Sequence, residues 1–540
     1  MSKPTFLLRQ SFFHRSRRCI TGSSSQQTST SPPRRNIAAP ALATSVRPFN
    51  EIPGPIALPM LRHSAHVLPR IGNYHHAVGL GLLEGLRDKY GDLVRLAKAS
   101  RSRPVLYVFD PELIREVYES GTTEPPSFEK SPLCQHRKAV GQCPAHGYSG
   151  ETRAIWAAIR ALLQDGSLLR NYERAFDGIA SDTTRRLGDL RYAENALNEE
   201  LETEIYRWAI ETLGMMIFGI RLGCLEGAVH KPCPNTRKPE KTSMDDEIHD
   251  LCSLSQRPLD ELTPAERLIR CSREISDGSY LVRSEATLKT DNPTFNNALK
   301  TFDRHFSLTE HFLMKALNEL NSGELKQEQI LLDKLRPLKG KILPLSADIL
   351  LAGVDPLAQT ALHMFYQLSL HAARQQRAHD EVHWSIASRK EGDSPELPYI
   401  AACAREAMRL HPATGGVVRR NYEPILLAGF EVPAGVDIVL AHGVTSKSEK
   451  QWGRANTFIP ERWCSDDWQP LKATRAHPYA SMPFGERCPG TAVVGGMLAA
   501  LTTRVLDKYR LEWHGPAPNV TTSGVNRLNP PYYFVLQNAA

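Results

Sequence analysis

A cysteine placed immediately before a predicted apolar helix is the feature that most restricts what this chain can fold into. Residues 480–490 read A-S-M-P-F-G-E-R-C-P-G, in which the cysteine is Cys488. Free amides at a helix N-terminus stabilise a thiolate, so we expect a lowered pKa for this thiol. A buried structural cysteine is the alternative interpretation. In residues 491–508 the apolar side chains that recur near helical spacing are Val493, Val494, Met497, Leu498, Leu501, Val505 and Leu506.

Two charged motifs precede this cysteine in the chain. Glu406 and Arg409 lie three residues apart and can share one helix face, and Arg462 follows within a Pro-Glu-Arg element. One carboxylate can receive both guanidinium groups in a buried triad. The spacing alone is weak evidence, because Glu112 and Arg115 have it too and such a pair usually lies on the surface. The order of the motifs along the chain is the stronger signal.

In this order the motifs resemble those of the cytochrome P-450 family, which are haem-thiolate enzymes. The resemblance covers roughly residues 50–540. It implies a mainly α fold with small β-sheets, the cytochrome P-450 fold. It also implies a haem b cofactor whose iron takes Cys488 as its axial thiolate ligand. Such a ligand pushes electron density onto the iron and favours cleavage of a bound O–O bond.

The cysteine loop departs from the pattern of that family. The family has its phenylalanine seven residues before the cysteine and an arginine two residues before it. Here Phe484 stands only four residues before Cys488, so the loop is three residues shorter, and Glu486 holds the place of the arginine. Hydrogen bonds around a metal ligand tune the metal, so the shortening bears on haem binding. The loop residues that the resemblance implies as haem contacts are Phe484, Arg487 and Gly490.

Further haem contacts are implied outside the loop. Trp156 and Arg160 lie one helical turn apart and can face the same propionate, and Arg419 is expected at the other propionate. The resemblance also implies that the two arginines and the glutamate of the charged motifs form a structural triad beneath the haem. These three residues are Glu406, Arg409 and Arg462.

A long apolar segment, residues 342–371, resembles the helix that crosses the distal face of the haem. Ala352 and Gly353 are expected to leave room for dioxygen there, and Asp355 is expected to pass protons toward the iron. The family has a threonine after this acid, and this chain has Pro356. Proline removes a backbone donor and crowds the preceding turn, so we expect a kink at this point.

Residues 204–211 and 218–225 resemble segments of the mitochondrial members of the family, which hydroxylate sterols, secosteroids and ecdysteroids. The resemblance therefore implies a steroid-like substrate, dioxygen, and an adrenodoxin-like acidic ferredoxin that docks near Arg405. A second docking position is occupied by the uncharged Ala401. Ecdysteroid 2-hydroxylation is the most specific activity implied, together with peripheral association with the matrix side of the inner membrane.

The net charge of +7 does not indicate a nucleic-acid partner. Residues 1–50 hold eight of the 66 basic residues and no acidic one, which leaves 58 basic against 59 acidic residues in the remainder. An arginine-rich, serine-rich, acid-free leader is typical of a mitochondrial presequence. We therefore expect residues 1–48 to be a cleaved presequence, disordered before its removal, and residues 49–540 to form the haem-thiolate catalytic domain.

Three alternatives stay open at this stage. A haem-thiolate hydroperoxide isomerase or dehydratase needs no proton relay and would tolerate Pro356. A haem-binding protein that has lost catalysis would explain why the two departures from the family pattern, the shortened cysteine loop and Pro356, fall on opposite sides of the iron. Finally, the three-residue gap in the cysteine loop could be an error in the sequence. Cys134, His136, Cys143 and His146 offer side chains that can bind zinc, but their spacing matches no common finger, so we expect a polar loop there instead.

Overall fold

The computed structural model describes residues 46–55, 79–96, 103–126, 131–142, 150–191, 200–227, 257–283, 293–323, 331–388, 396–464 and 471–539, together with residues 197 and 229. Its α-helices are α1 Leu80–Tyr90, α2 Pro111–Glu119, α3 Pro132–Ala139, α4 Gly150–Gln164, α5 Gly166–Asp189, α6 Glu200–Phe218, α8 Pro264–Arg283, α9 Pro293–Ser322, α10 Leu331–Leu335, α11 Ile342–Leu370, α12 Ala372–Ser388, α13 Pro398–Leu410, α14 His442–Thr445 and α15 Val494–Lys508. The strands are β1 Arg47–Pro48, β2 Leu93–Leu96, β3 Val105–Val108, β4 Thr123–Glu124, β5 Val417–Asn421, β6 Ile425–Leu427, β7 Phe430–Val432, β8 Asp437–Leu440, β9 Tyr509–Trp513, β10 Val520–Ser523, β11 Val525–Leu528 and β12 Phe534–Asn538.

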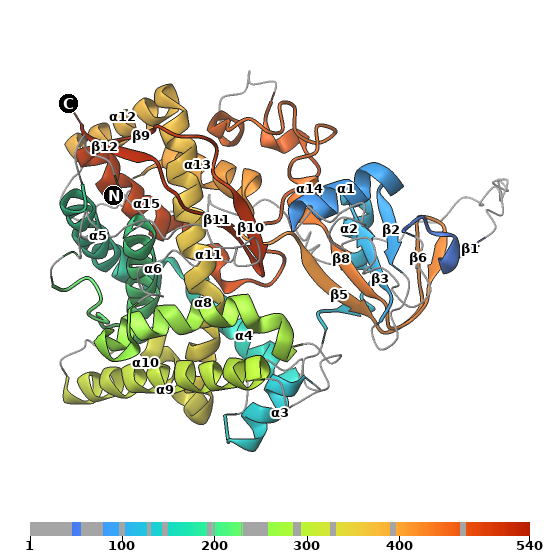
Figure 1. The fold of residues 1–540 in the computed structure, drawn as a ribbon, viewed down its shortest axis with the longest axis horizontal. Helices are drawn as coiled ribbons and strands as arrows, with labels where there is room; N and C mark the ends of the chain where they lie inside the picture. Colours follow the sequence, from blue (N-terminus) through green and yellow to red (C-terminus); the bar gives the residue numbers. More distant parts are fainter. Residues whose placement is uncertain are drawn as a thin grey trace, which may run out of the picture.

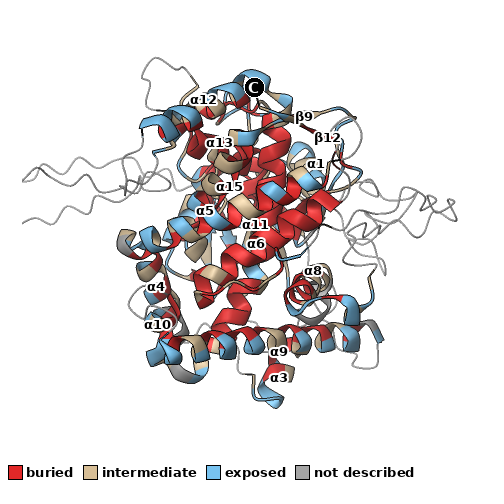
Figure 2. Ribbon diagram, turned by 90° about the vertical axis from the view of Figure 1, so that its left-hand side faces the viewer, coloured by how far each residue is buried: buried red, intermediate tan, exposed pale blue. Residues whose placement is uncertain are grey.

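The helical part of the molecule is built around α11, which runs through its centre (Figures 1 and 2). Helices α6, α8, α9 and α13 pack against it, and α15 packs against α5. A helix with apolar residues on all its faces is stable only when neighbours cover it. Among the described residues α11 alone is long and apolar enough to cross a membrane, and 72% of its most apolar window is buried inside the molecule.

The five-stranded and three-stranded sheets form the second part, at the right of Figure 1, whereas β9 and β12 lie at its upper left and β10 and β11 near its centre. The largest has five strands in the order β2-β3-β8-β5-β4, with β3 parallel to β8 and the other pairs antiparallel. Three smaller sheets pair β1 and β6 with β7, β10 with β11, and β12 with β9. The expected fold class, mainly α with small β-sheets, is therefore confirmed.

One of two local expectations needs correction. The helix after Cys488 does not begin at Thr491, because residues Pro489–Ala492 form a 3-10 turn and α15 starts at Val494. Pro356 lies inside α11 without ending it, because α11 is α-helical from Ile342 to Leu370, and the expected kink at this residue stays a prediction. Burial on most sides of α11 outweighs the cost of the missing backbone hydrogen bond.

Candidate active site

Cys488 lies half-buried at the head of the turn that leads into α15. Backbone amides of Gly490 and Thr491 donate to its sulfur, as expected at the start of a helix, and the positive charge of Arg160 also favours the thiolate. Removal of the thiol from water has the larger effect, so the pKa of Cys488 is raised. The expectation of a lowered pKa was wrong for the protein without haem, because that expectation considered only the helix amides and not the burial of the thiol.

Gly490 allows the sulfur and its neighbours to come together. A β-carbon built on Gly490 would lie 3.4 Å from the Cys488 sulfur, 3.6 Å from Cε1 of Phe484 and 3.3 Å from Cγ2 of Val494. Any larger residue would therefore press on the sulfur and on the aromatic ring at once. The loop, although three residues short, still brings its phenylalanine to the cysteine.

Helix α4 fixes the loop from a second side. Trp156 and Arg160 lie four residues apart on α4, so their side chains share one face, and both are half-buried. Nη1 of Arg160 donates to the backbone carbonyl of Arg487 at 3.0 Å. The side chain of Arg160 thus lies beside the cysteine loop, whereas Arg487 itself is exposed.

Arg419 comes from β5 and is only 4% exposed. Its Nε donates to Oγ1 of Thr123 at 2.9 Å, and its Nη2 donates to the carbonyl of the same residue. Its Nη1 lies 3.4 Å from Oε2 of Glu486, and its guanidinium lies over the ring of Tyr118. The glutamate that replaces the family's arginine therefore places an anion on the arginine expected to hold a propionate.

Of Ala352 and Gly353, the two residues expected to leave room for dioxygen, only Ala352 presents an open surface. Ala352 is exposed, whereas most residues of α11 are buried. Gly353 faces α6 instead, because a β-carbon there would come within 3.0 Å of Cδ1 of Leu213. Room next to the helix is consequently provided at Ala352, while Gly353 permits the close approach of α6.

Asp355 is buried in an ion-pair network rather than facing open space. It is 1% exposed, and it receives Nη2 of Arg527 on Oδ2 at 2.6 Å and the hydroxyl of Tyr206 on Oδ1. Burial raises the pKa of Asp355, but the charge and hydrogen bonds of Arg527 outweigh this effect, so the pKa lies below its usual value. Arg527 also binds Asp277, whose pKa burial raises. Arg273 adds a second positive charge to the network.

Replacing Arg527 with methionine is expected to lower the free energy of unfolding by about 3–5 kcal/mol at neutral pH, because it leaves a buried carboxylate uncompensated. The lowered pKa of Asp355 means that its contribution is present above the unfolded pKa of about 3.9 and is lost as the pH falls through the folded value. Without Arg527 burial dominates and the folded pKa rises, so the variant gains relative stability in acid. The difference between the two proteins should shrink from pH 7.5 to pH 5 in urea unfolding.

A matched control for that experiment is Arg510→Met, because Arg510 lies exposed on β9 in a 3.6 Å pair with Glu512. It should leave the unfolding curve nearly unchanged at both pH values. A destabilisation by Arg527→Met that stays constant between the two pH values would show that the titration of Asp355 is not its cause.

The structure brings the three triad residues together. Arg409 donates to the Glu406 carboxylate through Nε at 2.9 Å and Nη2 at 2.7 Å, and Nε of Arg462 lies 3.1 Å from Oε1. All three side chains are fully buried. The carboxylate also accepts from the indole of Trp463 and the amide of Ile459. Arg409 further donates to backbone carbonyls on the segment that leads to Pro460–Trp463, so the triad fixes that segment to α13.

Sequence reasoning missed several partners of the site. Tyr206 lies in a segment used only to assign a subgroup, although a tyrosine on an apolar helix is a common partner for a buried acid. Arg527 and Thr123 carried no signal, because they lie 172 and 296 residues from the partners they bind. Of the four residues considered for zinc, Cys143 and His146 lie outside the described residues, and His136 contacts Asp303 at 2.9 Å.

The residues present fit a haem. The sulfur of Cys488 receives two amides, Gly490 keeps the space beside it free of a side chain, and Arg160 supplies a positive charge at the loop. On α11, Ala352 offers an open surface. Cys488 would hold the iron, Arg160 would hold one propionate, and Arg419 would hold the other in place of its 3.4 Å contact with Glu486. When bound, the haem supplies the iron centre at which dioxygen is activated.

The fold and this site together define a haem-thiolate protein. A family model described as cytochrome P-450 matches residues 64–536. The chain belongs to the cytochrome P-450 family and is an oxidoreductase of the monooxygenase type, with haem as its cofactor and a thiolate as axial ligand.

Named relatives share about a quarter of their residues with this chain. The probable cytochrome P-450 301a1, mitochondrial, of Drosophila melanogaster is 24% identical, over 88% of this chain and 84% of the relative. Cytochrome P-450 12b1, mitochondrial, of Drosophila acanthoptera is 23% identical, over 92% and 90%. The 25-hydroxyvitamin D-1 alpha hydroxylase, mitochondrial, of Rattus norvegicus is 26% identical, over 70% and 73%.

Proposed function

We propose that this enzyme is a mitochondrial monooxygenase that hydroxylates a steroid-like lipid with dioxygen and electrons from a ferredoxin. The observation that carries the proposal is the position of Cys488 at the head of the turn before α15, with Gly490 against its sulfur and Arg160 beside the loop. The steroid-like substrate and the mitochondrial compartment are supported by the relatives, three of which are mitochondrial and one of which is a 25-hydroxyvitamin D hydroxylase. Hydroxylation of an ecdysteroid at position 2 is the most specific form of this proposal.

A small acidic ferredoxin would dock by charge complementarity, which mainly sets the rate and orientation of encounter. Arg405 on α13 is half-buried, and burial lowers its pKa. Ala401, one turn earlier, is only 6% exposed. Arg377 on the adjacent α12 is 49% exposed and lies over the ring of Tyr399. The positive charge available to an acidic ferredoxin therefore comes from Arg377 on α12 as well as from Arg405 on α13.

The site residues on the distal side favour slow proton delivery. Pro356 has no hydroxyl, and Thr360, one turn later, donates its hydroxyl to the carbonyl of Pro356 at 2.7 Å. Asp355 is held by Arg527 and Tyr206. These contacts support a second candidate function, a haem-thiolate isomerase or dehydratase acting on a lipid hydroperoxide, which needs neither a proton relay nor a reductase.

Pro356→Thr is expected to raise the amount of hydroxylated product formed per NADPH consumed and to lower peroxide release. Positioned proton transfer is typically worth about 10² to 10⁴ in rate, so even part of it should be visible. The assay combines the haem-loaded enzyme with ferredoxin, its reductase, NADPH and a steroid panel that includes 2-deoxyecdysteroids. Pro356→Ala is the matched control, because it restores the backbone amide without supplying a hydroxyl.

Three results would count against this account. Equal coupling in the threonine and alanine variants would show that the missing hydroxyl is not limiting. No turnover of any steroid, combined with rearrangement of lipid hydroperoxides in the absence of NADPH, would replace the monooxygenase with the isomerase. Normal haem binding with neither reaction would indicate a protein that has lost catalysis.

We further propose that residues 1–48 are a mitochondrial presequence that is removed on import. Of these residues only 46–48 are described, and Arg47 and Pro48 pair with β7, with the Arg47 guanidinium 3.8 Å from the centre of the Phe430 ring. Expression with a C-terminal tag and sequencing of the mature N-terminus should locate the cleavage before about residue 49. A mature protein that begins at Met1 and is recovered with the endoplasmic reticulum would contradict both the leader and the compartment.

A further inference from the structure

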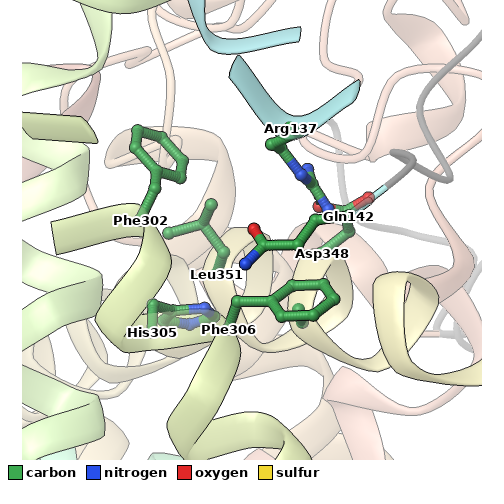
Figure 3. Close-up of a pocket in the computed structure, with 8 residues that line it drawn as sticks. Arg137, Gln142, Phe302, His305, Phe306, Asp348 and Leu351 are labelled. Atoms are coloured by element: carbon green, nitrogen blue, oxygen red, sulfur yellow. The ribbon is translucent and has the colours of Figure 1, made fainter. Parts of the chain in front are cut away.

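A small pocket is lined by residues of α3, α9 and α11 and by Gln142 (Figure 3). Its volume is about 10 Å³, which is close to the space that one water molecule needs. Aromatic and aliphatic side chains form part of its wall, and four different polar groups form the rest. The lining residues are Arg137, Gln142, Phe302, His305, Phe306, Ala347, Asp348 and Leu351.

The two charges of the pocket neutralise each other. Nη1 of Arg137 lies 3.0 Å from Oδ1 of Asp348, and the two side chains are 8% and 3% exposed. The guanidinium also lies 5.9 Å from the centre of the Phe306 ring. A buried ion pair of this geometry leaves little net charge to attract an ionic ligand.

His305 supplies a polar atom that the protein does not use. Its side chain is 2% exposed, and Nε2 is buried without a hydrogen-bond partner. Burial lowers the pKa of His305 to about 4, so the ring is neutral at physiological pH and can donate or accept one hydrogen bond. Figure 3 shows the side-chain amide of Gln142 pointing into the same space. A buried polar atom without a partner is costly, which favours a ligand atom beside it.

We propose that this pocket is a subsite for a single hydroxyl or keto oxygen carried by a lipophilic substrate. The volume admits one oxygen atom and excludes a carboxylate or phosphate, each of which has at least three heavy atoms. Phe302, Phe306 and Leu351 suit an apolar body next to that oxygen. The inference rests on the proposed function, because it assigns the subsite to the substrate of the monooxygenase.

The position of the pocket supports this assignment. Asp348 and Ala352 lie four residues apart on α11, so they share a face and are separated by about 6 Å along the axis. Leu351 lines the pocket and directly precedes Ala352, the residue with the open surface. A ligand with its oxygen in the pocket would therefore extend toward the open surface at Ala352, which is the residue expected to border the oxygen site.

The test compares two tritiated probes that differ by one hydroxyl, 5α-cholestan-3β-ol and 5α-cholestane. Both are presented from the same cyclodextrin to the haem-loaded protein, and binding is measured by equilibrium dialysis. The alcohol should bind roughly three- to tenfold more tightly than the hydrocarbon, as one neutral hydrogen bond predicts. His305→Phe should remove this preference, His305→Gln should retain part of it, and the affinity for the hydrocarbon should stay within about twofold in each.

His311→Phe is the matched control, because His311 is an exposed histidine on the same helix. Gln142→Leu provides a second route if the variants of the buried His305 fail to fold, and it should weaken the preference. Equal binding of the two probes to the unmodified protein would show that the pocket holds water only and would overturn the proposal. An undiminished preference in His305→Phe would overturn it as well. Because dialysis needs no electron donor, selective binding of the alcohol together with no turnover of any steroid in the panel would contradict the proposed function and leave the subsite standing.

Discussion

Arg409→Ala is expected to yield little haem-loaded protein and to lower the free energy of unfolding by about 3–5 kcal/mol, because it leaves a fully buried carboxylate with half of its charge partners. The Glu406 carboxylate would keep Arg462, but it would lose the two-pronged contact from Arg409. Three backbone carbonyls, on Ser446, Ala455 and Thr457, would lose a donor at the same time. Arg409→Lys keeps the positive charge but cannot contact the carboxylate through two nitrogen atoms at once, so its effect should be smaller than that of Arg409→Ala.

The chain contains a matched control for this variant. Arg115 and Glu112 have the same three-residue spacing on α2, but they lie on the surface, and Arg115 also pairs with Glu119. Arg115→Ala should change neither haem content nor the unfolding curve appreciably. Urea unfolding and the ratio of haem to protein provide the two readouts. If Arg409→Ala and Arg115→Ala behave alike, the buried triad does not support the site.

The sequence could predict those features that depend on local spacing. A glutamate and an arginine three residues apart, followed by a distant Pro-Glu-Arg element, indicated a shared carboxylate, and the three side chains do meet. The apolar segment from residue 342 indicated one long buried helix, which is α11. In both cases the pattern lies within one helix or one short segment, where the spacing of residues in the sequence determines which side chains lie on the same face.

Other features depend on contacts between distant segments and could not be read from spacing. Asp355 was assigned to proton delivery from its neighbours in the chain, whereas its carboxylate is held by Arg527, which no local pattern connects to it. Gly353 was expected to make room for a ligand, but the side that lacks a side chain faces Leu213 of α6. The pKa of Cys488 is decided by burial, which a sequence does not show directly. Tertiary packing sets each of these outcomes.

The loss of the cysteine ligand should have the largest effect of any single change. Cys488→Ser removes the sulfur and leaves the two amides from Gly490 and Thr491 around a weaker ligand. A serine hydroxyl stays protonated near neutral pH, so it cannot replace a thiolate as the donor of electron density to iron. We expect no ferredoxin-supported hydroxylation by this variant. Cys464→Ser is the control, because Cys464 is also a half-buried cysteine outside any disulfide and lies outside the cysteine loop.

The absorption spectrum of the reduced, carbon monoxide-bound protein tests the central claim most directly. The unmodified chain and Cys464→Ser should both give the absorption typical of a thiolate-ligated haem, and Cys488→Ser should give none of it. This measurement needs no substrate and no ferredoxin, so it tests the ligand independently of the proposed reaction. A thiolate-type spectrum that persists unchanged in Cys488→Ser, or its absence from the unmodified chain supplied with haem, would contradict the assignment of Cys488 as the iron ligand.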